Sequence, residues 1–244
     1  MAKIGLQLYS IKEISEKDFF GAVRLAAECG YDGIEFAGFF NTPAKELKKL
    51  LKDTEIEVCG SHTGISLLND EFESTVEYNL ELGNKYIVVP ALPEEMRNSH
   101  DAWLKTSETM NVLAERLGEY GITLGYHNHA YEFDMFNGTR GYDIFAANTN
   151  PEILLEIDTY WVAYPGVDVL KYVEKYKDRL ELIHIKDMGP DRKNIEIGSG
   201  SIDFPKIIET AVNTEWYIVE QEYFTIPMEE SIKISCDYLK GLLK

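Results

Sequence analysis

The sequence contains few cysteines and no long apolar segment. The three cysteines, Cys29, Cys59 and Cys236, lie far apart, and their odd number argues against a disulfide framework or a zinc cluster. We expect them to be small buried side chains in a reducing cytoplasm. No apolar run reaches the ~18 residues that a membrane helix needs. Residues 1–10 read as a strand and lack the charged and apolar zones of a signal peptide.

Basic residues are also scarce. Lysine and arginine total 24 against 42 acidic residues, which gives a net charge of −18. This charge repels phosphate backbones and anionic lipids, so the composition disfavours binding to nucleic acid or to a membrane. The acidic surplus is compatible with solubility alone and equally with a site that gathers a metal cation.

A regular alternation of short and long segments is what the sequence does contain. β-rich apolar runs are expected as strands at residues 4–8, 33–36, 57–60, 86–89, 123–126, 153–157, 182–185 and 217–219. Amphipathic stretches between them are expected as helices at residues 19–29, 44–51, 72–82, 102–120, 142–147, 169–176, 205–212 and 229–243. Eight such units in 244 residues predict an α/β fold, a single (β/α)8 TIM barrel domain spanning residues 1–244. An open doubly wound sheet is the alternative, but no glycine-rich turn follows the first strand.

Histidines gather where the predicted strands end. His62 follows the third strand, His127 and His129 follow the fifth, and His184 ends the seventh, whereas His100 lies near a helix start. Active sites of TIM barrels lie at the C-terminal ends of the strands. The four histidines are therefore candidates for a functional site.

Carboxylates occur in the same places, inside strands where an unpaired charge is costly to bury. Alternation with period two places Glu156 with Asp158, and Glu220 with Glu222, on one side of their strands, and pairs His184 with Lys186. A divalent cation accepts such a mixture of oxygen and nitrogen ligands. Ion pairs at strand ends remain the alternative explanation for each residue taken alone.

The chain resembles the xylose isomerase-like barrels, in particular the sugar phosphate isomerase/epimerase group. The resemblance covers nearly the whole chain. It rests on Ile4-Gly5-Leu6-Gln7-Leu8-Tyr9-Ser10, Gly33-Ile34-Glu35, Tyr126-His127-Asn128-His129-Ala130-Tyr131-Glu132-Phe133, Glu156-Ile157-Asp158-Thr159-Tyr160-Trp161, His184-Ile185-Lys186-Asp187, Gly198-Ser199-Gly200 and Val219-Glu220-Gln221-Glu222.

The resemblance implies a metal site and a reaction. In the ketose 3-epimerases and inosose dehydratases of this group, a divalent ion is held by Glu, Asp, His and Glu from strands five to eight, which correspond here to Glu132, Asp158, His184 and Glu220. Mn²⁺ is the expected ion, with Mg²⁺, Co²⁺ and Zn²⁺ as alternatives. Glu132 and Glu220 would also be the catalytic acid/base pair of a sugar isomerase or epimerase that removes a proton next to a carbonyl.

Five further residues are expected to contact a small sugar or keto-sugar substrate. They are His62, His127, His129, Trp161 and Lys186. Trp161 would offer an apolar wall to a sugar face, and Lys186 would hold or protonate a substrate oxygen. Either role competes with a structural one, such as a core tryptophan or a lysine paired with a glutamate.

Other functions remain open alternatives. A dehydratase or lyase acting on a keto-sugar or inosose shares the first proton removal, so the sequence does not separate it from an epimerase. A non-catalytic sugar-binding barrel and an apurinic endonuclease-like nuclease are further alternatives, and the net charge of −18 opposes the nuclease. The substrate, its phosphorylation and self-association of the chain are left open.

Overall fold

Eight parallel strands form a closed barrel in the computed structural model, which describes residues 2–244. The strands follow one another around the barrel in the order β1-β12-β9-β8-β5-β4-β3-β2. Their bounds are β1 Lys3–Gln7, β2 Gly33–Phe36, β3 Glu57–His62, β4 Tyr86–Val89, β5 Thr123–His127, β8 Leu154–Asp158, β9 Leu182–Ile185 and β12 Trp216–Val219. The predicted TIM barrel is confirmed, and all eight predicted strands are present.

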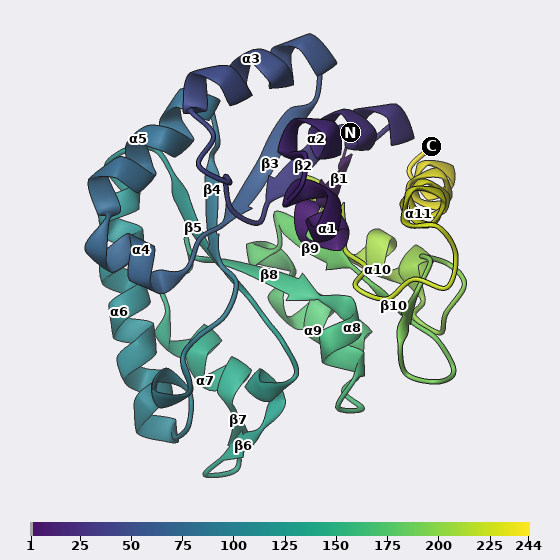
Figure 1. Ribbon diagram of the computed structural model, residues 1–244. Helices are drawn as coiled ribbons and strands as arrows, with labels where there is room; N and C mark the ends of the chain where they lie inside the picture. The colour runs from purple at the N-terminus through teal and green to yellow at the C-terminus, as the bar shows by residue number, and fades with distance from the viewer. Residues whose placement is uncertain (1) are drawn as a thin grey trace.

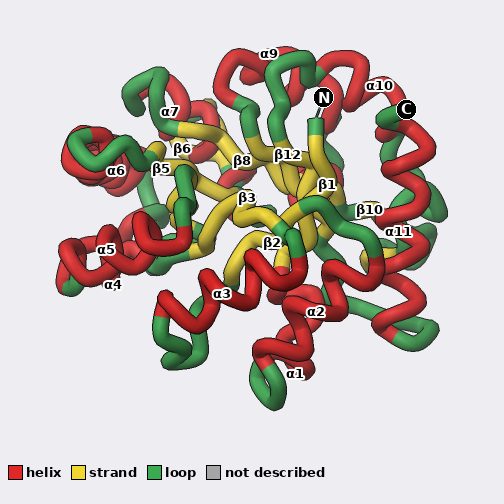
Figure 2. Tube along the Cα trace, turned by 90° about the horizontal axis from the view of Figure 1, so that it is seen from above, coloured by secondary structure: helices red, strands yellow, loops and turns green. Residues whose placement is uncertain are grey.

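Helices surround the barrel on its outer face, as the view along the barrel shows (Figure 2). The longer ones are α2 Phe19–Cys29, α3 Ala44–Thr54, α5 Phe72–Leu82, α6 His100–Gly118, α7 Gly141–Asn148, α9 Val169–Tyr176, α10 Phe204–Thr210 and α11 Met228–Leu242. Each overlaps a predicted helix. Within residues 2–244, no helix combines the length and the apolar character needed to cross a membrane.

The structure adds short elements that the sequence pattern did not predict. They are helices α1 Lys12–Ser15, α4 Ile65–Asp70 and α8 Thr159–Ala163, and two hairpins, β6 Met135–Phe136 with β7 Thr139–Arg140 and β10 Asp187–Met188 with β11 Asn194–Ile195. Four 3-10 turns also occur, at Leu8–Ile11, Glu94–Met96, Tyr131–Phe133 and Lys177–Arg179. None of these segments is long enough to show a hydrophobic period. In Figure 1 the β6–β7 hairpin projects from the edge of the molecule.

The interior of the barrel changes from apolar to polar along the strands. Apart from the main hydrophobic core, a smaller buried apolar cluster contains Cys59, Val88, Leu154, Leu182, Trp216 and Ile218. On β8 the residues two and four positions beyond Leu154 are Glu156 and Asp158, and on β9 Leu182 is followed at the same spacing by His184 and Lys186. Because side chains on a strand alternate between faces, each of these strands extends from an apolar floor to a polar mouth.

The three cysteines are free and buried, in agreement with the sequence prediction. The register between β2 and β3 shifts at Ile34/Glu35. Glu35 pairs there with Gly60, and a Cβ atom at Gly60 would lie 2.7 Å from Glu35 Oε1. The glycine therefore leaves room for a carboxylate inside the barrel.

Candidate metal and active site

Four side chains from four neighbouring strands converge at the mouth of the barrel. The ligand-type atoms of His127, Asp158, His184 and Glu220 all lie within 4.8 Å of one another. His184 Nδ1 lies 2.7 Å from Glu220 Oε2, and His127 Nε2 lies 3.6 Å from Asp158 Oδ2 and 3.8 Å from Glu220 Oε2. Ligands each about 2.0–2.2 Å from a shared ion are separated by about 3–4 Å, so the spacing suits a single cation.

The orientation of His127 leaves one ring nitrogen directed into this cluster. Its Nδ1 lies 3.4 Å from the carbonyl oxygen of Pro90, to which it donates, while Nε2 is buried and has no hydrogen-bond partner within residues 2–244. Burial, with the nearby His184, His62 and His129, holds the pKa of His127 well below its usual value, so its ring is neutral. A neutral imidazole with a free lone pair is the form that binds a metal ion.

Asp158 presents a similarly free oxygen atom. Oδ1 accepts a hydrogen bond from the Trp161 amide at 2.8 Å, at the start of α8, whereas the buried Oδ2 has no hydrogen-bond partner in the described chain. The Asp158 amide donates to Asn128 Oδ1 at 3.0 Å, which fixes the end of β8. Burial raises the pKa of Asp158 to about 6, although Lys186 opposes this rise. A cation would supply the charge that these two orphaned atoms, Asp158 Oδ2 and His127 Nε2, lack.

A second group of polar side chains lies against the first and shares His184. The ligand-type atoms of Glu35, His62, Glu156 and His184 also lie within 4.8 Å of one another. His184 Nε2 lies 2.7 Å from Glu35 Oε2, and His62 Nε2 lies 2.9 Å from Glu156 Oε2. Gln7 donates to Glu35 Oε2 at 2.7 Å. We call Glu35, His62 and Glu156 the inner layer.

The two carboxylates of the inner layer have very different pKa values. Burial acts to raise the pKa of Glu35, but His62 and His184 outweigh it and lower this pKa to about 2. Burial and the neighbouring Glu35 carboxylate raise the pKa of Glu156 to about 7. Burial acts to lower the pKa of His184, but Glu156 and Glu35 raise it well above the usual value.

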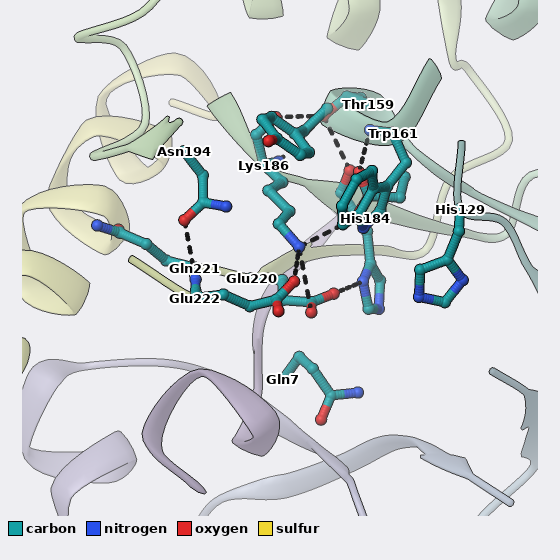
Figure 3. Close-up of polar contacts among 12 residues, drawn as sticks. Gln7, His129, Thr159, Trp161, His184, Lys186, Asn194, Glu220, Gln221 and Glu222 are labelled. Carbon is teal, nitrogen blue, oxygen red and sulfur yellow. Dashed lines mark hydrogen bonds and ion pairs between the residues drawn. The ribbon is translucent and has the colours of Figure 1, made fainter. Parts of the chain in front are cut away.

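Lys186 is fully buried and lies close to three carboxylates. Its Nζ contacts Glu222 closely and lies 3.4 Å from Glu220 Oε1 (Figure 3). It also lies 3.9 Å from Asp158 Oδ2. Burial acts to lower the pKa of Lys186, but Glu220, Asp158 and Glu222 raise it. Burial acts to raise the pKa of Glu220, but Lys186 and His184 hold it well below its usual value. Lys186 thus favours the ionised form of Glu220.

A cavity of about 410 Å³ opens onto the mouth of the barrel. It is lined by Tyr9, Ala37, Gly38, His62, Pro90, Ala91, His127, His129, Trp161, Glu220 and Glu222. Four of the five residues expected to contact substrate therefore line it, and Lys186 does not. Trp161 forms part of the wall beside His129, with ring centroids 5.6 Å apart.

The structure places Glu132 elsewhere. Its Oε2 accepts a hydrogen bond from the His129 amide at 2.8 Å, and its Oε1 lies 2.5 Å from the Tyr126 hydroxyl. Glu132 belongs to neither cluster and does not line the cavity. The chain leaves β5 at His127 and then turns through the 3-10 helix Tyr131–Phe133, which directs the Glu132 side chain back toward Tyr126. Of the four expected ligands, the structure brings together Asp158, His184 and Glu220, and it places His127 in the remaining position.

Glu35 and Gln7 are residues of the site to which the sequence analysis gave no role, and Glu156 was noted there only as a charge on the same strand face as Asp158. Glu35 lies between Ile34 and Phe36 in an otherwise apolar strand, where an ionised group is expensive to bury without partners. Glu156 lies two residues before Asp158 and on the same face. Intrastrand charge was therefore the signal that could have identified both carboxylates.

The loop with Gly198, Ser199 and Gly200 follows β9, where TIM barrels often bind phosphate. Here the backbone amides of the loop already donate hydrogen bonds to the Asp187 carboxylate. Its Oδ2 accepts from the Gly198 and Gly200 amides at 3.0 and 2.9 Å, and its Oδ1 accepts from the Met188 and Ile202 amides at 2.8 and 3.2 Å. These donors are consequently not free to hold a phosphate group.

Comparisons with known proteins agree with this fold. An inosose dehydratase from Geobacillus kaustophilus is 27% identical over 80% of this chain and 77% of its own length. The crystal structure of a sugar phosphate isomerase/epimerase from Parabacteroides distasonis is 27% identical, with a TM-score of 0.87, and covers 100% of this chain and 96% of its own. The structure of the IolI protein with a bound zinc atom shares the fold at 17% identity and a TM-score of 0.78, covering 99% of this chain and 98% of its own.

The family assignment rests on a match along most of the chain. The sequence model of the family described as "Xylose isomerase-like TIM barrel" matches residues 23–242, and it covers the strands β2 to β12 that carry His127, Asp158, His184 and Glu220. The chain therefore belongs to the xylose isomerase-like TIM barrel family.

Proposed function

We infer that this protein is a divalent-cation-dependent dehydratase that removes water from a keto-polyol, a small molecule with several hydroxyl groups and one carbonyl. The observation that carries the proposal is that two buried atoms, His127 Nε2 and Asp158 Oδ2, make no hydrogen bond within residues 2–244 and lie in one cluster with His184 and Glu220 beside the cavity. His127, Asp158, His184 and Glu220 would hold the cation. The zinc atom bound in IolI, which shares the fold, supports the proposal that the reaction depends on a metal ion.

The donor set suggests which ions the site would prefer. Two imidazole nitrogens and two carboxylate oxygens favour a transition metal such as Mn²⁺, Co²⁺ or Zn²⁺ over Mg²⁺, which binds oxygen ligands. Such an ion would polarise a carbonyl oxygen and stabilise the negative charge that develops when a neighbouring C–H bond breaks. His62, His129 and Glu222 line the cavity and are not needed as ligands, so they are available to bind substrate hydroxyls and to move protons.

Loss of water fits the cavity better than epimerisation does. An epimerase needs acid/base groups on both faces of the reacting carbon, and the expected pair was Glu132 with Glu220. Because Glu132 hydrogen-bonds to Tyr126 and His129 outside the cavity, that pair is not assembled. The inosose dehydratases among the relatives support elimination from a cyclic keto-polyol.

The cavity also favours a substrate without a phosphate group. Neither lysine nor arginine is among its lining residues, while the Glu220 and Glu222 carboxylates are. The loop after β9 uses its amides to bind Asp187. A phosphate would therefore meet two carboxylates and no basic side chain among the lining residues.

An epimerase is the second candidate, because a relative of known structure carries the name sugar phosphate isomerase/epimerase. Incubation of the Mn²⁺- or Zn²⁺-loaded protein with inososes and ketoses in heavy water, followed by NMR, separates the two. We expect an unsaturated ketone and loss of one water molecule. Deuterium exchange with inversion at the exchanging carbon and no loss of water would assign epimerisation. No reaction with either the inososes or the ketoses would contradict the proposed enzyme class.

A further inference from the structure

The inner layer and His184 together form two carboxylate–imidazole pairs that lie side by side. The rings of His62 and His184 are stacked, with centroids 5.2 Å apart and an interplanar angle of 11°. Each ring directs its Nε2 atom at a fully buried carboxylate, His184 at Glu35 and His62 at Glu156. The two rings therefore have the same orientation relative to the carboxylates.

When Glu35 and Glu156 are both ionised, the inward nitrogens carry hydrogen. His184 Nε2 lies 2.7 Å from Glu35 Oε2 and 3.3 Å from Glu156 Oε2, and His62 Nε2 lies 2.9 Å from Glu156 Oε2 and 3.2 Å from Glu35 Oε2. A lone pair on either Nε2 would face two carboxylate oxygens, whereas an N–H group donates to them. The hydrogen bond made by one ring nitrogen sets the role of the other.

The outward nitrogens face two different partners. His184 Nδ1 is directed to Glu220 within the proposed cation cluster. His62 lines the cavity, and its Nδ1 makes no hydrogen bond to the described chain. Once the inward nitrogen of each neutral ring holds the hydrogen, the outward one has a lone pair to offer.

We propose that Glu35 and Glu156 are positioning residues that fix both rings as the Nε2–H tautomer, so that His184 offers Nδ1 to the cation and His62 offers Nδ1 to a substrate hydroxyl. This inference rests on the proposed function for the roles of the two Nδ1 atoms, but the tautomers themselves do not depend on it. The carboxylate of Glu35 acts through His184, and that of Glu156 acts through His62.

The proton positions can be read directly, because the chain has only five histidines. Long-range ¹H–¹⁵N NMR of the Zn²⁺-loaded protein, at alkaline pH where the rings are neutral, distinguishes protonated from unprotonated ring nitrogens, and single histidine variants assign the signals. We expect Nε2–H on both His62 and His184. A proton on Nδ1 of either ring would overturn the proposal, and this measurement needs no variant of the inner layer to fold.

Two matched variants then separate the pairs. Outer partners of metal-bound histidines contribute about 10–100-fold to metal affinity. Glu35→Gln should weaken Zn²⁺ binding, measured by chelator competition, by about that factor, whereas Glu156→Gln should change it less than about 3-fold. Glu156→Gln should instead raise KM for the substrate found in the screen. Equal effects of both variants on Zn²⁺ affinity would overturn the division of roles.

A buried glutamate outside the site provides the control. Glu196 contacts Ser231 and Gln221, and Glu196→Gln should leave Zn²⁺ affinity unchanged. Binding of two Zn²⁺ equivalents, one of them lost in Glu35→Gln, would also overturn the proposal, because the inner layer would then be a second ligand set. Absence of Zn²⁺ binding by the wild-type protein would instead contradict the proposed function, and the proton position on His62 would still test this inference.

Discussion

The carboxylate of Glu132 and the hydroxyl of Tyr126 face each other in the core, with Oε1 and Oη 2.5 Å apart. Burial raises the pKa of Glu132 to about 8, although Tyr126 and backbone amides oppose this rise. The group is therefore a neutral carboxyl at and below neutral pH. A neutral acid held away from the cavity is a structural element of the β5 loop.

Glu132→Gln should retain turnover within about 3-fold of wild type, because the side chain touches neither the cluster nor the cavity. Glu220→Gln, the matched change at the mouth, should reduce kcat by about 100-fold or more. Steady-state kinetics of both variants on one substrate measures the difference. A collapse of kcat in Glu132→Gln would return Glu132 to the mechanism and would favour the two-glutamate epimerase.

The raised pKa of Glu132 also predicts a pH dependence of stability. A carboxyl whose folded-state pKa exceeds its unfolded value contributes stability that is complete below the unfolded pKa and is lost as pH rises through the folded one. The window here extends from about pH 4.5 to about pH 8. In thermal unfolding of the metal-free proteins, the Tm of wild type should fall relative to that of Glu132→Gln as pH rises across this window. A constant difference would contradict a buried, neutral Glu132.

More of the fold than of the site could be predicted from the sequence. Strands such as 33–36 and 182–185 were predicted with their observed bounds, because apolar runs of fixed length alternate with helices and glycine punctuates the turns. Asp158 and Glu220 stood out because charge inside a buried strand needs a partner. These features are local, and local patterns fix strands and strand ends.

The remaining site residues could not be predicted, because their contacts join positions far apart in the sequence or depend on the path of a loop. Glu35 and His184 are 149 positions apart and meet only because the barrel closes. The direction of Glu132 depends on the path of a short loop after His127, where a single 3-10 turn decides which residue reaches the mouth. His127 was predicted to contact substrate, and the ligand role proposed for it depends on the hydrogen bond between its Nδ1 and the Pro90 carbonyl.

His127→Ala should lower cation affinity by more than about 100-fold, because a direct ligand contributes at least as much as an outer partner. His100 is the appropriate control, since it lies at the start of α6 outside both clusters. His100→Ala should bind Zn²⁺ or Mn²⁺ as wild type does. Isothermal titration of the metal-free proteins measures both affinities. Unchanged binding by His127→Ala would exclude its Nε2 from the site.

Lys186→Met should destabilise the metal-free protein by about 3–5 kcal/mol, because it leaves three buried or half-buried carboxylates without their cation. Saturating divalent cation should restore part of this loss, since the ion supplies positive charge at the same place. Urea unfolding with and without the ion measures both quantities. Lys175→Met, which breaks an exposed pair with Asp143, should cost only about 0–1 kcal/mol. Equal losses in the two variants would contradict the assigned role of Lys186.

Substrate charge provides a test that needs no variant of a proposed metal ligand. A keto-polyol that the enzyme dehydrates should lose at least about 100-fold in kcat/KM when one of its hydroxyl groups carries a phosphate, which corresponds to about 2.7 kcal/mol of transition-state stabilisation. The reason is that the cavity offers the Glu220 and Glu222 carboxylates and no lysine or arginine to a second anion. Glu222→Gln, which removes one of these charges, should narrow the ratio between the two substrates. A phosphorylated substrate turned over as fast as the free one would show that the phosphate lies outside this cavity, and it would remove the charge argument for an uncharged substrate.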